Sequence, residues 1–339
     1  MTITAPHPAE ARAPALPPAR GELSAAVSGR LRGRPGALPG ARAAAAADPY
    51  GEDLQLALHL CYELHYRGFA GVPDTAEWDP DLLRLRALLE ERFEGALREA
   101  CPGPATPDEV FDGLLTEPPD GRGVSRHLLR HGTPEQLREY AVLRSVQQLR
   151  ESDPQAWMLP RLHGRAKAGM VTVLYDEFGC GREERVHARL YADLMSALGL
   201  DPGYGRHLSA IGAPALATAN VMSLFGLHRA RRGALAGHFA ALEIGSSPTA
   251  SWHAAALRRC GAEEAARYYD EHVEADAVHA QLIRREVVGG LLAEEPGLAP
   301  DVAFGAEATV FLEDALAASV LRAWRSGGTA LRLPVEEEA

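Results

Sequence analysis

The stretch DPDLLRLRALLEERFEGA (Asp79–Ala96) shows how this chain of 339 residues folds locally. Asp79 followed by Pro80 is typical of a helix start, because an aspartate side chain accepts hydrogen bonds from the first N–H groups and proline fits the first turn. Apolar residues then recur three and four positions apart from Leu82 to Ala96, as on the buried face of a helix. The stretch therefore predicts one amphipathic helix.

The same signals continue through the rest of the chain, and the alternation typical of half-buried strands is almost absent after about residue 48. Thr133 to Gln136 form a capping-box start, and Asp153 with Pro154 opens the next helix. Further helices are predicted over roughly 134–151, 154–177, 186–199, 214–244, 262–294 and 301–327. The sequence predicts an all-α fold.

Composition narrows the class of protein. The chain has 46 acidic and 35 basic side chains, a net charge of −11, and 46% hydrophobic residues. This is a globular composition, and its negative charge argues against a nucleic-acid partner, which needs clustered lysine and arginine. The uncharged run Leu208–Leu227 contains Gly212, Pro214 and Asn220, so we interpret it as a core helix and expect no membrane partner.

The four cysteines form no CxxC pair, which suggests neither a disulfide framework nor a thiolate zinc site. No continuous apolar segment of a secretory signal follows the N-terminal arginines. We expect a cytoplasmic protein.

Three segments are expected along the chain. Residues 1–47 consist largely of Ala, Pro, Gly and Arg, and this composition predicts a disordered tail because few large side chains are available for burial. Residues 48–130 are predicted to form an N-terminal helical arm, and residues 131–330 the main helical domain.

The segment HVEADAVH (His272–His279) carries the clearest chemical signal. Positions i, i+4 and i+7 share one helix face, so His272, Asp276 and His279 are predicted to project together. Two imidazoles and one carboxylate suit Fe(II), Mn(II) or Zn(II). An acidic surface face, or histidines paired with Asp276, is the alternative.

Acidic and imidazole side chains in other apolar helices strengthen the metal hypothesis. Glu177, His187 and Glu243 each lie in an apolar helical setting, where an inward carboxylate needs a partner. Helical bundles hold dimetal carboxylate sites with such residues. Glu184 and His187 make a competing ExxH pair, and ideal helix geometry favours Glu184 over Glu177 as the partner of His187. The ten-residue step from Glu177 to His187 would require a distortion of the helix at Gly179 and Gly181.

Three stretches resemble the iron-containing redox enzyme family, the haem-oxygenase-like diiron oxidases and oxygenases. They are YDEFGCGREERVH (Tyr175–His187), GLHRARRGALAGHFAALE (Gly226–Glu243) and YDEHVEADAVH (Tyr269–His279). The resemblance implies metal ligands at Glu177, His187, Glu243, His272, Asp276 and His279, with Glu151 as an additional carboxylate. It selects Glu177 over Glu184.

The resemblance also implies a haem-oxygenase-like helical bundle that binds two irons (Fe2+/Fe3+) in place of haem and uses O2 as co-substrate. The expected protein is a non-haem diiron oxidase or oxygenase that acts on a small amino-acid, amine or fatty-acid-like substrate in specialised metabolism. An unidentified electron donor and a homodimer are expected with it. The alternative is a non-catalytic iron-binding scaffold or an iron-responsive partner protein.

Overall fold

The computed structural model describes residues 13–101, 103, 106–115 and 123–335, with only the backbone for 247–248 and 274–277. These residues form helices and connecting turns, with no strand among them beyond an isolated bridge between Phe178 and Val186. The all-α prediction is confirmed. The α-helices are α1 (Glu22–Leu31), α2 (Ala41–Ala46), α3 (Glu52–Glu63), α4 (Pro80–Ala100), α5 (Pro107–Leu114), α6 (Val124–His131), α7 (Pro134–Gln148), α8 (Asp153–Ala156), α9 (Gly164–Glu177), α10 (His187–Ala197), α11 (Ala213–Leu227), α12 (Arg232–Arg259), α13 (Arg267–Leu282), α14 (Gly289–Glu294) and α15 (Ala299–Arg325).

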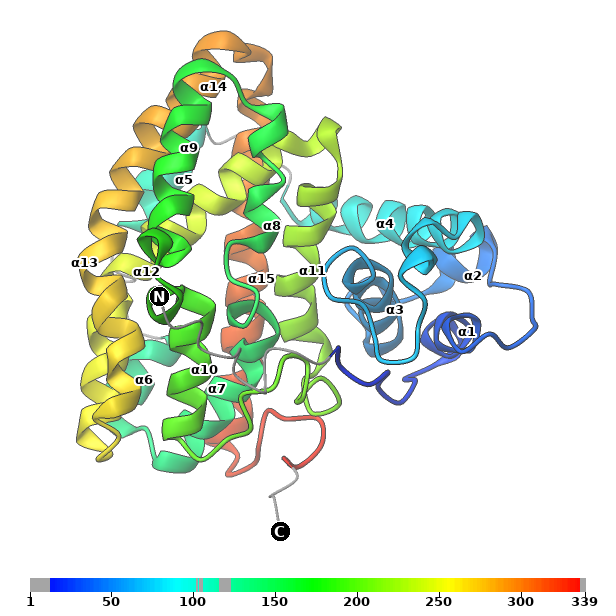
Figure 1. Cartoon of the computed structure of the whole chain (residues 1–339), viewed down its shortest axis with the longest axis horizontal. Helices are drawn as coiled ribbons and strands as arrows, with labels where there is room; N and C mark the ends of the chain where they lie inside the picture. The colour runs from blue at the N-terminus through cyan, green and yellow to red at the C-terminus, as the bar shows by residue number, and fades with distance from the viewer. Residues whose placement is uncertain (1–12, 102, 104–105, 116–122, 336–339) are drawn as a thin grey trace, which may run out of the picture.

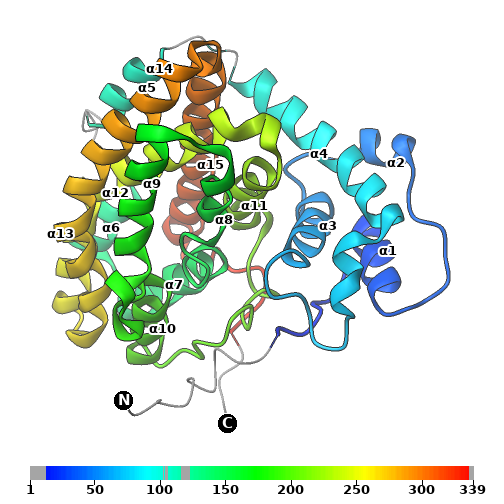
Figure 2. The same cartoon turned by 45° about the horizontal axis from the view of Figure 1, so that its top comes forward.

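The helices are arranged in two groups. Helices α1 to α4 lie together on one side of the molecule, and the larger group from α5 onward lies on the other (Figures 1 and 2). Helix α3 packs against α11, and α4 packs against α15, so both helices join the two groups. The expected boundary at residues 130/131 stays a prediction.

The prediction of a disordered tail over 1–47 is wrong for residues 13–47, while residues 1–12 lie outside the described residues. Leu23, Val27 and Leu31 are spaced four residues apart and form the buried face of α1, which packs on α3. The side chain of Asp53 accepts hydrogen bonds from the backbone N–H groups of Leu23 and Ser24. These contacts with α3 offset the ordering entropy that the segment cannot offset by itself.

Helix α11 is the central helix of the bundle. Nearly every residue from Ala213 to Gly226 is buried, and α3, α7, α8, α12 and α15 surround this helix. Its uncharged, largely apolar sequence therefore reflects burial on all sides, as expected for a core helix. Among the described helices none combines the length and hydropathy that a membrane span requires.

Two glycines allow α12 and α15 to cross with their backbones in contact. A Cβ atom on Gly237 would lie 1.8 Å from the carbonyl oxygen of Val302, and one on Gly305 would lie 2.0 Å from that of Ala234. No larger side chain fits at such distances. This crossing fixes the position of α12, which carries Glu243.

Three predicted helices are interrupted. The helix predicted from 154 to 177 consists of α8, a 3-10 turn and α9, and α9 begins at Gly164, which has a φ of +45°. The helix predicted over 214–244 is divided at His228, whose backbone is extended. The helix predicted over 262–294 contains a π-helical turn at Ile283–Val288 between α13 and α14, a distortion that often lies near functional sites.

Candidate metal centre

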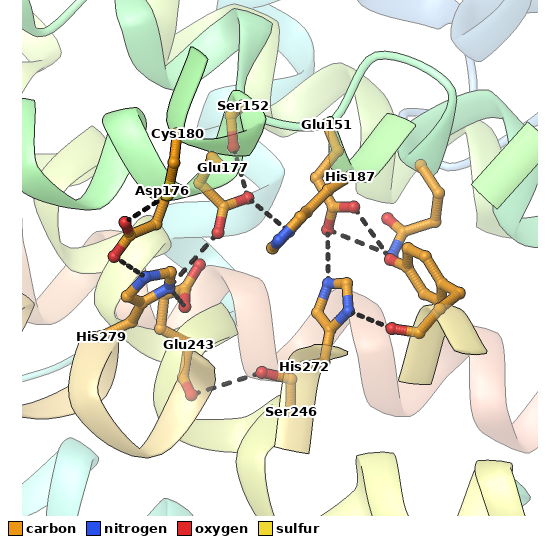
Figure 3. Close-up of polar contacts among 12 residues, drawn as sticks. Glu151, Ser152, Asp176, Glu177, Cys180, His187, Glu243, Ser246, His272 and His279 are labelled. Carbon is orange, nitrogen blue, oxygen red and sulfur yellow. Dashed lines mark hydrogen bonds and ion pairs between the residues drawn. The ribbon is translucent and has the colours of Figure 1, made fainter. Parts of the chain in front are cut away.

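Six predicted ligands meet in the interior as two groups of three. Glu151, His187 and His272 form one triad, and Glu177, Glu243 and His279 form the other (Figure 3); in each triad, one candidate ligand atom per residue lies within 4.8 Å of the others. The residues come from the end of α9, the start of α10, α12, α13 and the turn between α7 and α8. Residues far apart in the sequence thus converge in one place.

Glu177 connects the two triads. Its Oε2 lies 3.2 Å from Nδ1 of His187, and its Oε1 lies 3.3 Å from Nδ1 of His279. Oε2 of Glu243 lies at the same distance, 3.3 Å, from Nδ1 of His279. The rings of His187 and His272 are 4.4 Å apart between centroids. The two triads are therefore adjacent parts of one site.

The loop after α9 explains how Glu177 and His187 reach each other. Gly179, Cys180 and Gly181 all have positive φ angles, of 73°, 54° and 78°. A Cβ atom on Gly179 would lie 2.6 Å from the backbone nitrogen of Val186, so only glycine permits this tight return of the chain. The predicted distortion is present, and it turns the chain so that α10 begins at His187.

Glu184 lies outside the site. It is exposed in the 3-10 turn Glu183–Arg185, whereas Glu177 is only 3% exposed. The ExxH alternative rested on an uninterrupted helix from Glu184 to His187, and that helix is absent because α10 starts at His187. The structure therefore favours the assignment that came from the family resemblance.

The buried donor atoms fit a cation. His187 and His279 are 2% and 1% exposed, and the Nδ1 atom of each faces carboxylate oxygens at 3.2–3.3 Å with no other partner among the described residues. Imidazole nitrogen and carboxylate oxygen facing one point are the ligand types that iron accepts. The donor set therefore fits divalent transition metals.

The electrostatics of the site point the same way. Burial opposes the charge of Glu177, but His187 and His279 more than offset this effect and hold the pKa of the carboxyl well below its usual range. Burial also opposes protonation of His279, yet Glu177 and Glu243 raise the pKa of its imidazole to about 11. The carboxylates thus stabilise positive charge in a pocket that water hardly reaches.

Hydrogen bonds to the far side of two imidazoles leave one nitrogen of each facing the site. Nδ1 of His272 donates to the carbonyl oxygen of Tyr268 at 2.7 Å, so Nε2 faces Glu151. Nε2 of His279 donates to Asp176 at 3.3 Å, so Nδ1 faces Glu177 and Glu243. Such partners fix the tautomer of a ligating histidine.

Two carboxylates are also held in place by hydroxyl groups. Ser152 donates its hydroxyl hydrogen to Oε2 of Glu177 at 2.8 Å, and it does so from a backbone with a φ of 69°. Tyr268 donates its hydroxyl hydrogen to Oε2 of Glu151 at 2.9 Å and accepts from Gln148 at 2.7 Å. These contacts orient the carboxylates toward the imidazoles.

The supporting residues were not predicted from sequence. Asp176 directly precedes Glu177, and Tyr268 lies one helical turn before His272. This closeness in sequence to predicted ligands is the signal that could have identified both residues. Tyr175 and Tyr269 also lie close to predicted ligands in sequence but have other roles. Tyr175 is exposed and donates its hydroxyl hydrogen to the carbonyl oxygen of Cys180, and Tyr269 stacks on His253.

Asp276 is the one predicted ligand that the structure does not place. Its side chain lies outside the described residues, although its backbone belongs to α13. Its role stays a prediction from the sequence.

A cavity of about 430 Å³ adjoins the triads. Glu151, Glu177, Glu243 and His272 form part of its wall, together with apolar and aromatic side chains from α7, α12 and α15. This volume lies within the usual range for small-molecule sites. An organic molecule in the cavity would contact the candidate metal ligands.

The fold and the site define an all-helical protein with a paired histidine and carboxylate centre beside a small-molecule cavity. The family model described as "Iron-containing redox enzyme" matches residues 138–314, a segment that contains both triads. The chain belongs to the iron-containing redox enzyme family. A search of curated proteins gave no match.

Proposed function

We propose that the chain is an O2-dependent non-haem diiron oxidoreductase that acts on a small organic substrate. The observation that carries the proposal is the position of Glu177, whose two carboxylate oxygens face a histidine of each triad. A carboxylate in this position can bind two metal ions at once, as in the dimetal sites of helical bundles. Two separate structural sites would not need a shared side chain.

The residues present divide the tasks of such a centre. Glu151, His187 and His272 would hold one iron, and Glu177, Glu243 and His279 the other. Two ferrous ions bound there would supply the electrons that reduce O2 and thereby oxidise the substrate. Ser152, Asp176 and Tyr268 orient ligands through the hydrogen bonds described above, so that the geometry of the site exists before any metal binds.

The cavity favours an enzyme over an iron-binding scaffold. A scaffold needs buried ligands but no space beside them, whereas here the ligands form part of a cavity wall. A substrate in that space would lie within contact distance of the metals and exclude water from them. The expected electron donor and homodimer are part of the proposal.

Anaerobic loading with Fe(II), followed by rapid mixing with O2 in a stopped-flow spectrometer, tests the proposal. We expect two irons per chain and an absorption change in the visible range that tracks the consumption of O2. Glu184→Gln is the matched control, because it removes an exposed carboxylate near the site and should behave as the unmodified protein. Iron that binds but does not react with O2 would favour the scaffold and contradict an oxidase.

A further inference from the structure

One face of α7 lines the cavity, and the turn that follows α7 brings Glu151 of the metal centre to the same wall. Arg144, Gln147, Gln148 and Glu151 are spaced i, i+3, i+4 and i+7, and all four line the cavity. At a rise of about 1.5 Å per residue, seven residues span about 10 Å. Polar groups near Arg144 therefore lie about 10 Å from the candidate metal ligand Glu151, along α7 and the turn after it.

The far end of the cavity carries an excess negative charge. Nη1 of Arg144 donates to both carboxylate oxygens of Glu313 at 2.9 and 2.8 Å, so these two charges neutralise each other. The next residue, Asp314, also lines the cavity while its other side is exposed to solvent, and among the described residues no cation pairs with it. Burial and the neighbouring charge of Glu313 raise the pKa of Asp314, which is the effect of a carboxylate without a partner.

Gln147 gives a second, independent indication of the ligand. Its side chain lies on the cavity wall one helical turn from Arg144 and is 5% exposed. Its amide oxygen is buried and accepts no hydrogen bond from a described residue. A buried acceptor without a donor is costly, so a ligand that offers N–H groups would relieve this cost.

The remaining walls are largely apolar. Met222, Phe239, Leu242 and Leu316 are among the side chains that line the cavity. These side chains would pack against a hydrocarbon segment and would not solvate a second charge there. The ligand should therefore be charged at one end only.

We infer that the cavity binds a molecule with a cationic amino group held by Asp314 and Gln147, and with an apolar chain that extends toward Glu151. A distance of about 10 Å corresponds to about eight bonds of an extended chain. The identification of this ligand as the substrate rests on the proposed function, whereas its binding by the cavity does not. A fatty-acid carboxylate would have to displace Glu313 from Arg144, so it should bind more weakly.

Isothermal titration calorimetry with n-octylamine, octanoate and octan-1-ol tests the inference. The full-length protein is kept free of O2 and measured with and without bound metal, so that no turnover is needed. We expect the amine to bind about fivefold or more tightly than octan-1-ol or octanoate. Tighter binding of octanoate than of n-octylamine would overturn the inference.

Variants at the polar end make the test sharper. Asp314→Asn should weaken binding of the amine about fivefold without changing the binding of octan-1-ol. The control Glu184→Gln makes the same change in charge outside the cavity lining. It should change the affinity of neither ligand. Glu313→Gln should release Arg144 and strengthen binding of octanoate. Unchanged amine affinity in Asp314→Asn would overturn the inference, whereas amine binding without any reaction of iron with O2 would refute only the proposed function.

Discussion

The buried ion pair between Arg150 and Glu63 links α3 to the turn that carries Glu151. Nη1 of Arg150 lies 3.4 Å from Oε2 of Glu63, and both side chains are almost fully buried. Nη2 of Arg150 donates to the carbonyl oxygen of Ala219 at 3.0 Å and to the hydroxyl of Ser223 at 3.3 Å. Because the next residue is Glu151, the anchor of Arg150 positions a candidate metal ligand.

Arg150→Met should destabilise the protein by about 3–5 kcal/mol, because removal of one partner leaves the other charge buried. Glu63 would keep its hydrogen bond from Tyr204 at 2.8 Å but would lose its ion pair. Glu63→Gln in the same chain removes the remaining buried charge while keeping the shape of the side chain. The double variant should therefore recover about 2 kcal/mol or more.

Urea unfolding of the metal-free protein, followed by circular dichroism at pH 7, measures both free energies. Iron content after anaerobic loading gives the second result: Arg150→Met should bind less iron, because the turn that carries Glu151 loses its anchor. The reasoning would be refuted if Arg150→Met cost less than about 1 kcal/mol, or if the double variant were no more stable than the single one.

Three further predictions concern residues around the centre. Ser152→Ala and Ser152→Gly should both lower iron affinity about 10–100-fold, because Glu177 loses its hydrogen bond. The glycine variant should be about 1 kcal/mol more stable than the alanine variant, since residue 152 has a φ of 69°. Equal stability of the two variants in urea would contradict this. Asp176→Asn should weaken iron binding by about the same factor in chelator competition, because His279 loses the carboxylate that fixes its tautomer, and an unchanged affinity would count against it. Burial lowers the pKa of His253 to about 3, so the unfolded state binds more protons below about pH 6.5, and the stability of the metal-free protein should fall by up to about 1.4 kcal/mol per pH unit as the pH drops from 6.5 toward 3. Urea unfolding at pH 5 and pH 7 should show a smaller loss for His253→Phe, and an equal loss would exclude His253 as a cause.

Helix starts were predictable because their signals are local. Asp79 accepts hydrogen bonds from the backbone N–H groups of Asp81 and Leu82, and Thr133 forms a reciprocal capping box with Gln136. Such contacts involve residues within three positions of each other. Sequence reading is therefore reliable for where α4 and α7 begin.

The order of the N-terminal segment was not predictable from its composition. Arg20 pairs with Glu52 and donates to the carbonyl oxygen of Leu208, and Asp53 binds the start of α1. These partners lie about 30 or more positions away, so the segment alone contains no sign of them. The energy that orders it comes from tertiary contacts.

The site was predictable in its residue types but not in its details. A glutamate or histidine in an apolar helical stretch requires a partner, and this reasoning led to Glu177, His187 and Glu243. The left-handed backbone at Ser152 and the tyrosine hydroxyl that contacts Glu151 depend on how α7, α8 and α13 meet. No local pattern encodes these contacts.

The central claim is that Glu177 lies between two metal ions, each held by one triad. Anomalous diffraction at the iron edge, on crystals loaded anaerobically with Fe(II), tests it most directly. The account predicts two iron peaks about 3.5–4 Å apart, one beside His187 and His272 and the other beside Glu243 and His279, with the carboxylate of Glu177 in contact with both. A single peak, or two peaks without Glu177 between them, would contradict it.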